Sequence, residues 1–167
     1  MANYRGHAAG GVMAGGLVLA GHYLSTFKAV PDGGVIVDDW QLIIGVIVLA
    51  VLFGLWPDVD TNSKAQDLFV GIAFIVDLLL IASAQYVAAS LLGLLAMTPI
   101  IGHHRGWTHS KLAVFIVPLP IMIIPYLATN QVGDTAILLY IASVAGYMSH
   151  LLLDGLIFKW FRIKGGW

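Results

Sequence analysis

The chain has 167 residues, 59% of them hydrophobic and only 10% charged, with a mean hydropathy of +0.90. Long apolar runs at this composition predict a multi-pass protein of a cell membrane, since such segments are stable only in lipid. The formal net charge of -1 excludes the basic surface that nucleic-acid binding needs, and the absence of cysteine excludes disulfides and thiolate metal sites.

Two apolar segments open the chain. We expect the first, residues 6–27, to be a spanning helix rather than a secretory signal peptide, because no basic region followed by a cleavage site stands out. It carries small residues at the four-residue spacing that lets helix backbones approach closely in lipid; the pairs are Gly6/Gly10 and Gly11/Gly15. The second segment, residues 41–56, ends before Pro57, because proline cannot continue a helix that it does not begin.

The apolar stretch 68–101 is too long for one ordinary span. As a single helix it would measure about 50 Å, whereas the hydrocarbon core of a bilayer is about 30 Å thick. It forms either one long tilted helix or two short helices that meet near Ser83-Ala84-Gln85. A hairpin would place seven of the eight Lys and Arg residues on one side, which is the bias expected of a cytoplasmic face, so we expect the hairpin.

The last two apolar segments are residues 111–128 and 135–160. Prolines predict kinks in the first of them; they are Pro118, Pro120 and Pro125. With the hairpin, the whole chain has about six membrane segments. We therefore expect an all-α, polytopic membrane bundle that forms a single domain over residues 1–167, with its polar site at the cytoplasmic face.

A histidine-rich stretch lies between the apolar segments. Three of the six histidines fall within residues 103–109; they are His103, His104 and His109. Imidazole is the commonest metal-binding side chain. Either these residues converge from a turn, with Thr108 or Ser110 capping the helix that follows, or the stretch is only a polar loop between two membrane helices.

The six-segment topology places other ionisable residues at the same face. His7 begins the first segment, and Asp58 and Asp60 follow the second. His150 and Asp154 are four residues apart, so they share one face of a helix, as metal ligands or a hydrogen-bonded pair would. Asp58 and Asp60 either point into a shared site or act as separate helix caps.

Apart from His103, these side chains supply four imidazoles and three carboxylates. Zinc accepts this mixture of ligands, and carboxylates can bridge two ions. We expect one or two divalent ions, with zinc as the first choice and manganese or magnesium as alternatives. The candidate metal ligands are His7, Asp58, Asp60, His104, His109, His150 and Asp154.

Four motifs, in order along the chain, carry a resemblance to a known family. They are Gly6-His7, Leu55-Trp56-Pro57-Asp58-Val59-Asp60, His104-Arg105-Gly106-Trp107-Thr108-His109-Ser110 and Gly146-Tyr147-Met148-Ser149-His150-Leu151-Leu152-Leu153-Asp154. They resemble the YdjM-like family of membrane-bound metal-dependent hydrolases. The resemblance implies the seven ligands above and a distant relation to the zinc-dependent phospholipase C and single-strand nuclease superfamily. The chain departs from the family pattern at Thr61, where a histidine is common, and in its tail after Asp154.

These features predict an enzyme of a prokaryotic inner membrane. We expect a metal-dependent hydrolase that cleaves a phosphoester of a membrane lipid or lipid-linked substrate. Arg105 would neutralise phosphate charge, and His103 would serve as general acid or base. Two other functions use the same residues: a divalent-metal or proton transporter, and a non-catalytic membrane protein whose metal joins helix ends. The sequence identifies no protein partner.

Overall fold

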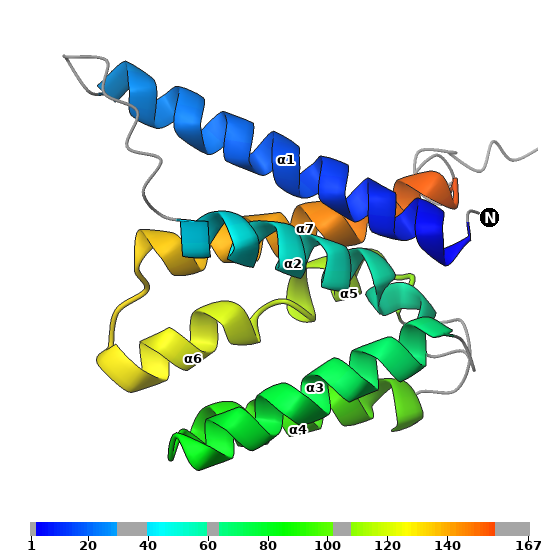
Figure 1. Ribbon diagram of the computed structural model, residues 1–167, viewed down its shortest axis with the longest axis vertical. Helices are drawn as coiled ribbons and strands as arrows, with labels where there is room; N and C mark the ends of the chain where they lie inside the picture. The colour runs from blue at the N-terminus through cyan, green and yellow to red at the C-terminus, as the bar shows by residue number, and fades with distance from the viewer. Residues whose placement is uncertain (1–2, 30–39, 60–63, 102–107, 156–167) are drawn as a thin grey trace, which may run out of the picture.

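The computed structural model describes residues 3–29, 40–59, 64–101 and 108–155, and Figure 1 shows these residues as helices joined by turns. The elements are α1 (Tyr4–Ala29), α2 (Trp40–Leu55), the short 3-10 helix η1 (Trp56–Asp58), α3 (Lys64–Ala82), α4 (Tyr86–Ile101), α5 (Lys111–Ile116), α6 (Pro120–Thr129) and α7 (Asp134–Leu153). The described residues contain no strand, so the predicted all-α class is confirmed.

Helices α1, α2 and α7 form a closely packed bundle (Figure 1). Glycines let their backbones touch. A Cβ atom added to Gly146 of α7 would lie 2.0 Å from the carbonyl oxygen of Ala50 in α2. One added to Gly11 of α1 would lie 2.7 Å from the Cα atom of Val51. Small residues thus serve the close helix packing that the glycine-rich first segment predicts.

Helices α3 and α4 form the expected hairpin, which excludes a single long helix over residues 68–101. The turn between them is Ser83 to Gln85. Ala84 adopts a left-handed conformation with φ 58°, and the N–H of Gln85 donates to the carbonyl of Leu80 at 2.8 Å. A left-handed residue of this kind commonly ends a helix, because the chain leaves the helix axis there while the last carbonyls remain paired.

The membrane segment expected over residues 111–128, with kinks at its prolines, appears as the spanning-length segment Lys111–Thr129. At two of these prolines the helix is interrupted: α5 ends at Ile116 and α6 begins at Pro120. Pro118 and Pro120 lack an N–H group and cannot continue the hydrogen-bond ladder of α5, while proline is favourable at the first position of a new helix. Pro125, in contrast, lies inside α6.

The last helix is shorter than the expected 135–160. Helix α7 ends at Leu153, and Asp154 forms its C-cap. Gly155 follows with φ 70°, the left-handed conformation in which glycine commonly ends a helix. Asp154 therefore stands at the end of α7 and not inside a continuing helix.

Four segments are long and apolar enough to cross a membrane: Tyr4–Thr26, Trp40–Asp58, Lys111–Thr129 and Asp134–Leu153. They support a multi-pass membrane protein. The apolar part of α3, Phe69–Ala82, is shorter and would cover only about 20 Å of a bilayer core of about 30 Å. Of the six expected membrane segments, the structure thus shows four of spanning length and a hairpin of two shorter helices.

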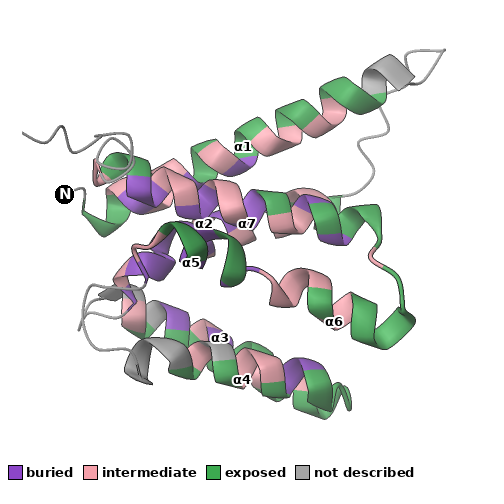
Figure 2. Cartoon of the chain, turned by 180° about the vertical axis from the view of Figure 1, so that it is seen from behind, coloured by how far each residue is buried: buried purple, intermediate pink, exposed green. Residues whose placement is uncertain are grey.

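Buried residues concentrate where α2, α5 and α7 meet (Figure 2). This core includes Phe53 and Trp56 from the end of α2 and the start of η1, Val114 from α5, and Tyr147 and Leu151 from α7. The core therefore lies directly beside the chain segments that carry Asp58 and His150.

Candidate metal centre

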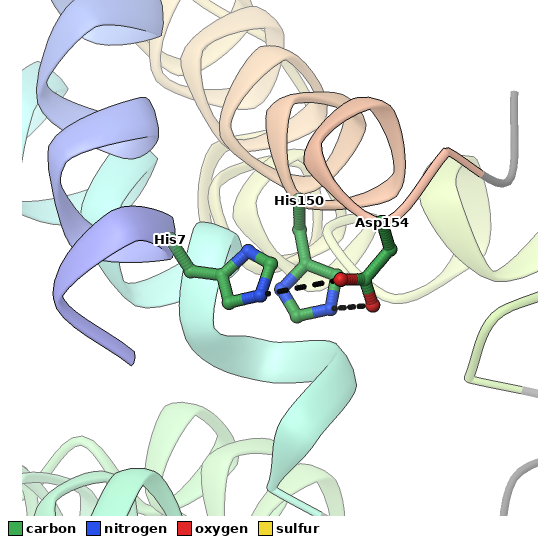
Figure 3. Close-up of side chains that lie close together, drawn as sticks. All are labelled: His7, His150 and Asp154. Atoms are coloured by element: carbon green, nitrogen blue, oxygen red, sulfur yellow. Dashed lines mark ion pairs between the residues drawn. The ribbon is translucent and has the colours of Figure 1, made fainter. Parts of the chain in front are cut away.

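Three helices of the bundle bring ionisable side chains to one end of the molecule. His7 lies near the start of α1, whereas Asp58 follows α2 in η1. His150 lies in the last turn of α7, and Asp154 is its C-cap. Because α1 runs antiparallel to α2 and α7, the start of α1 and the ends of the other two helices meet. Figure 3 shows the imidazoles of His7 and His150 beside the carboxylate of Asp154.

Two imidazole nitrogens and two carboxylates face one another in this cluster. The Nε2 atom of His7 lies 3.8 Å from Oδ2 of Asp58 and 3.6 Å from Oδ1 of Asp154. The Nε2 atom of His150 lies 3.6 Å from Oδ1 of Asp58 and 3.5 Å from Oδ2 of Asp154. The two rings are stacked with their centroids 3.7 Å apart.

These separations fit a shared ion better than direct hydrogen bonds. A hydrogen bond between such atoms would be about 2.7–3.2 Å long. Ligands around a tetrahedral ion, with metal–ligand bonds of about 2.1 Å, lie roughly 3.4 Å from one another. The four nitrogen–oxygen distances, 3.5–3.8 Å, are close to that second value.

Burial makes the unpaired atoms of the cluster costly. His7 is 1% exposed, His150 is 0% exposed, and the side chain of Asp154 is 3% exposed. His7 Nδ1, His150 Nε2 and Asp154 Oδ1 have no hydrogen-bond partner among the described residues. A buried polar atom without a partner typically costs about 1–3 kcal/mol. A cation bound by His150 Nε2 and the carboxylate of Asp154 would remove that cost for these two side chains.

The backbone of α2 sets the orientation of His150. Its Nδ1 atom lies 2.8 Å from the carbonyl oxygen of Gly54. Because a carbonyl can only accept, Nδ1 donates and carries the proton, which leaves the lone pair of Nε2 facing the carboxylates. The helices crowd at Gly54, where an added Cβ atom would lie 3.3 Å from the carbonyl oxygen of His7.

His109 lies at the edge of the same cluster. Its ring meets that of His150 edge to face, with the centroids 5.7 Å apart. One ligand atom from each of Asp58, His109 and His150 lies within 4.8 Å of the others. The Nδ1 atom of His109 is 3.1 Å from the hydroxyl oxygen of Thr108. His109 is therefore placed to complete the ligand set from the segment before α5.

A second contact fixes that segment, and sequence reasoning missed it. The hydroxyl of Tyr147 donates to the backbone carbonyl of Thr108, and both residues are fully buried. Tyr147 precedes His150 by three residues, so the two share one face of α7. This hydrogen bond docks the segment carrying His109 onto the helix that carries His150. The only signal in the sequence was the helical spacing of Tyr147 and His150.

The structure thus brings together five of the seven predicted metal ligands. They are His7, Asp58, His109, His150 and Asp154. The remaining two ligands and the two predicted catalytic residues lie outside the described residues, where their roles stay predictions; they are Asp60, His104, His103 and Arg105. Of the two predicted caps of α5, the structure selects Ser110, whose hydroxyl accepts from the N–H of Ala113 at 3.2 Å.

The cluster is open on one side. The side chain of Asp58 is 32% exposed and His109 is half-buried, whereas the other three side chains are buried. Structural zinc sites are usually closed, whereas catalytic sites keep a position for water or substrate. The exposed side of Asp58 gives such access.

Comparison with known proteins identifies the family. The family model of the YdjM inner membrane protein matches residues 1–159. No curated protein and no solved structure matches the chain. The match covers nearly the whole sequence, and the four apolar helices of spanning length agree with an inner-membrane location. The chain belongs to the YdjM inner membrane protein family.

Proposed function

We propose that the protein is a metal-dependent hydrolase of the inner membrane that cleaves a phosphoester of a lipid or lipid-linked substrate. One observation carries the proposal: two imidazoles and two carboxylates lie together with nitrogen–oxygen distances of 3.5–3.8 Å, and two groups of three possible ligands share His150. Three of these four side chains are buried, and the fourth, Asp58, opens the cluster to one side.

His7, Asp58, His150 and Asp154 would hold the ion, with His109 as a further ligand. Zinc suits this set of nitrogen and oxygen atoms, and manganese or magnesium are alternatives. When bound, the ion would supply a Lewis acid that activates water and neutralises phosphate charge. His150 binds through Nε2 alone, because Gly54 holds its Nδ1 proton. Through His150 the described residues can therefore hold one ion.

The place of the cluster supports a lipid substrate. The ligands lie at the ends of α1, α2 and α7, three helices that contain segments of spanning length. The end of such a segment is where lipid head groups begin. A phosphate at that level would reach Asp58, the exposed member of the cluster. His7 and His150 are buried and would keep water out of the interior of the cluster.

The same placement weighs against the other two functions. A transporter would need ligands at several depths along its helices, whereas all five described ligands gather at one end. A metal that only joins helix ends would sit in a closed site, whereas the Asp58 side chain is one-third exposed. A hydrolytic site satisfies both observations.

Phosphate release from metal-loaded protein tests the proposal. The wild type, reconstituted in lipid vesicles with zinc or manganese, is assayed on a phospholipid, a polyprenyl phosphate and a soluble phosphate ester. We expect turnover of at least one lipid substrate and its loss by roughly 100-fold or more in Asp154→Asn, which keeps the side-chain shape but removes a ligand charge. Cleavage of the soluble ester alone would contradict the lipid assignment, and equal activity in Asp154→Asn would contradict the metal site.

A further inference from the structure

An apolar cavity of about 160 Å³ lies beside the metal centre, between α2, α3, α4 and α6. Every side chain that lines it is hydrophobic. The lining includes Leu49, Phe53 and Trp56 from α2 and η1, Phe69 from α3, Leu92 from α4 and Ile121 from α6. An apolar cavity of about 150 Å³ in another protein stays dry and binds benzene, so a cavity of this size can hold part of a hydrocarbon chain.

The cavity follows α2 and begins close in sequence to Asp58. Its lining begins at Trp56, two residues before Asp58, and reaches Leu49 along α2. Seven residues of helix correspond to about 10 Å. A ligand whose polar end lies at Asp58 would therefore extend an apolar tail into the cavity, in the direction in which a lipid chain leaves its head group.

The cavity exists because two elements leave space beside the bundle. The chain breaks between α5 and α6, and Pro120 at the start of α6 lines the cavity. The α3–α4 hairpin forms the other wall, where the Phe69 ring meets the Trp56 ring edge to face with the centroids 4.5 Å apart. The hairpin touches α6 and η1 more than α1 or α7, so this wall is separate from the tightly packed bundle.

We propose that this cavity binds the hydrocarbon chain of the substrate lipid while the phosphate lies at the metal centre. The inference rests on the proposed function, which it extends by giving the chain a site of its own. A hydrocarbon chain is the one occupant that matches a lining of hydrophobic side chains that follows α2 from Trp56, two residues from Asp58, to Leu49. A soluble phosphate ester would leave the cavity unused.

Fluorescence quenching tests chain binding without hydrolysis. Trp56 is kept as the only tryptophan by replacing Trp40, Trp107, Trp160 and Trp167 with phenylalanine, and the protein is placed in vesicles of phospholipid with brominated acyl chains. Trp56 lines the cavity and is otherwise buried, so a chain inside the cavity lies closer to its ring than the surrounding lipid does. We therefore expect the bromine atoms of a chain in the cavity to quench the Trp56 fluorescence.

Matched substitutions on α4 locate the quenching. Leu92→Phe fills the cavity, whereas Leu94→Phe adds the same ring to a side chain that is 64% exposed and does not line the cavity. We expect Leu92→Phe to remove at least half of the quenching and Leu94→Phe to keep it. Ile121→Phe fills the cavity from α6 and should act like Leu92→Phe if that variant fails to fold. Equal quenching in all folded variants would overturn the proposal.

Hydrolysis of short-chain and long-chain esters separates this proposal from the proposed function. With phosphatidic acids of both lengths, we expect Leu92→Phe to raise KM roughly tenfold for the long chain and to leave the short-chain KM unchanged. A polyprenyl phosphate assayed in parallel tells whether the chain is acyl or isoprenyl. Cleavage of the long-chain ester with the same KM in wild type and Leu92→Phe would overturn the proposal that the cavity binds the chain, and would leave the hydrolase proposal standing. No cleavage, with quenching still sensitive to Leu92→Phe, would overturn the hydrolase and keep the chain site.

Discussion

The α1–α2–α7 bundle and the α3–α4 hairpin are both largely apolar, yet their helices meet in different ways. In the bundle, Gly146 leaves no room for a Cβ atom against the backbone of α2, whereas Gly71 and Gly93 of the hairpin have open space around them. Large side chains such as Phe74 and Leu79 face outward from α3. The comparison shows a closely packed bundle, which positions the candidate metal ligands, beside a less closely packed hairpin, which borders the cavity.

The largest effect should come from adding one methyl group to the bundle. In Gly146→Ala the new Cβ atom would lie 2.0 Å from the carbonyl oxygen of Ala50, so α2 and α7 must separate. This separation would pull His150 away from Asp58. We expect loss of bound metal and destabilisation of about 1–3 kcal/mol or more, measured by metal analysis and thermal unfolding in one detergent.

Two glycine substitutions serve as controls for that change. Gly16 in α1 and Gly93 in α4 have no neighbouring atom within 4 Å of an added Cβ atom. We expect Gly16→Ala and Gly93→Ala to bind metal like the wild type. A Gly146→Ala protein with normal metal content and stability would contradict the claim that the closely packed bundle positions the metal ligands.

Removal of the metal should affect the two regions unequally. An ion that binds only the folded state stabilises it by about 2.7 kcal/mol at a concentration one hundred times its Kd. After chelation, we expect amide hydrogen exchange to accelerate at the ligand ends of α1, α2 and α7 and to stay unchanged at the turn between α3 and α4. Readdition of zinc should restore the protection. An equal acceleration of hydrogen exchange in the bundle and in the hairpin would contradict the claim that the metal stabilises the bundle alone.

A smaller effect is expected from the hydroxyl that docks the His109 segment. Tyr147→Phe removes the donor to the buried carbonyl of Thr108, which should cost about 1–3 kcal/mol and weaken metal binding roughly tenfold. Tyr140→Phe is a matched control on the same helix, because its hydroxyl donates at 3.0 Å to the carbonyl of Phe115, in an exposed place away from the ligands. Equal metal affinity in both variants would show that the Tyr147 hydrogen bond does not contribute to metal binding.

The smallest effect should follow a change on the outer face of the hairpin. Phe74 in α3 is 63% exposed and contributes to no core cluster among the described residues. Substitutions at such positions usually alter stability by less than about 0.5 kcal/mol. We expect Phe74→Ala to bind metal with wild-type affinity in a titration followed by calorimetry. A marked loss of affinity would mean that the hairpin also supports the metal centre.

The sequence was informative wherever a local pattern determines the outcome. The length of residues 68–101 and the distribution of basic residues predicted the hairpin that forms at Ala84. The spacing of His150 and Asp154, together with the topology, predicted a cluster that also contains His7. These predictions needed only helix periodicity and the positions of segment ends.

Contacts between distant segments could not be predicted in the same way. The carbonyl of Gly54 orients His150 across 96 residues, and the hydroxyl of Tyr147 reaches Thr108 across 39. Both use a backbone carbonyl, which every residue possesses, so no residue type marks the acceptor. The end of α7 at Leu153 was also missed, because Gly155 ends a helix only when it adopts a left-handed conformation.

Metal content tests the central claim most directly. Plasma mass spectrometry would compare purified wild type with Asp154→Asn and with Asp134→Asn, the same substitution at the opposite, exposed end of α7. We predict a stoichiometric divalent ion in the wild type and in Asp134→Asn, and its loss in a folded Asp154→Asn protein. Absence of metal from the wild type after reconstitution with zinc or manganese, or equal metal content in all three proteins, would contradict a metal centre formed by His7, Asp58, His150 and Asp154.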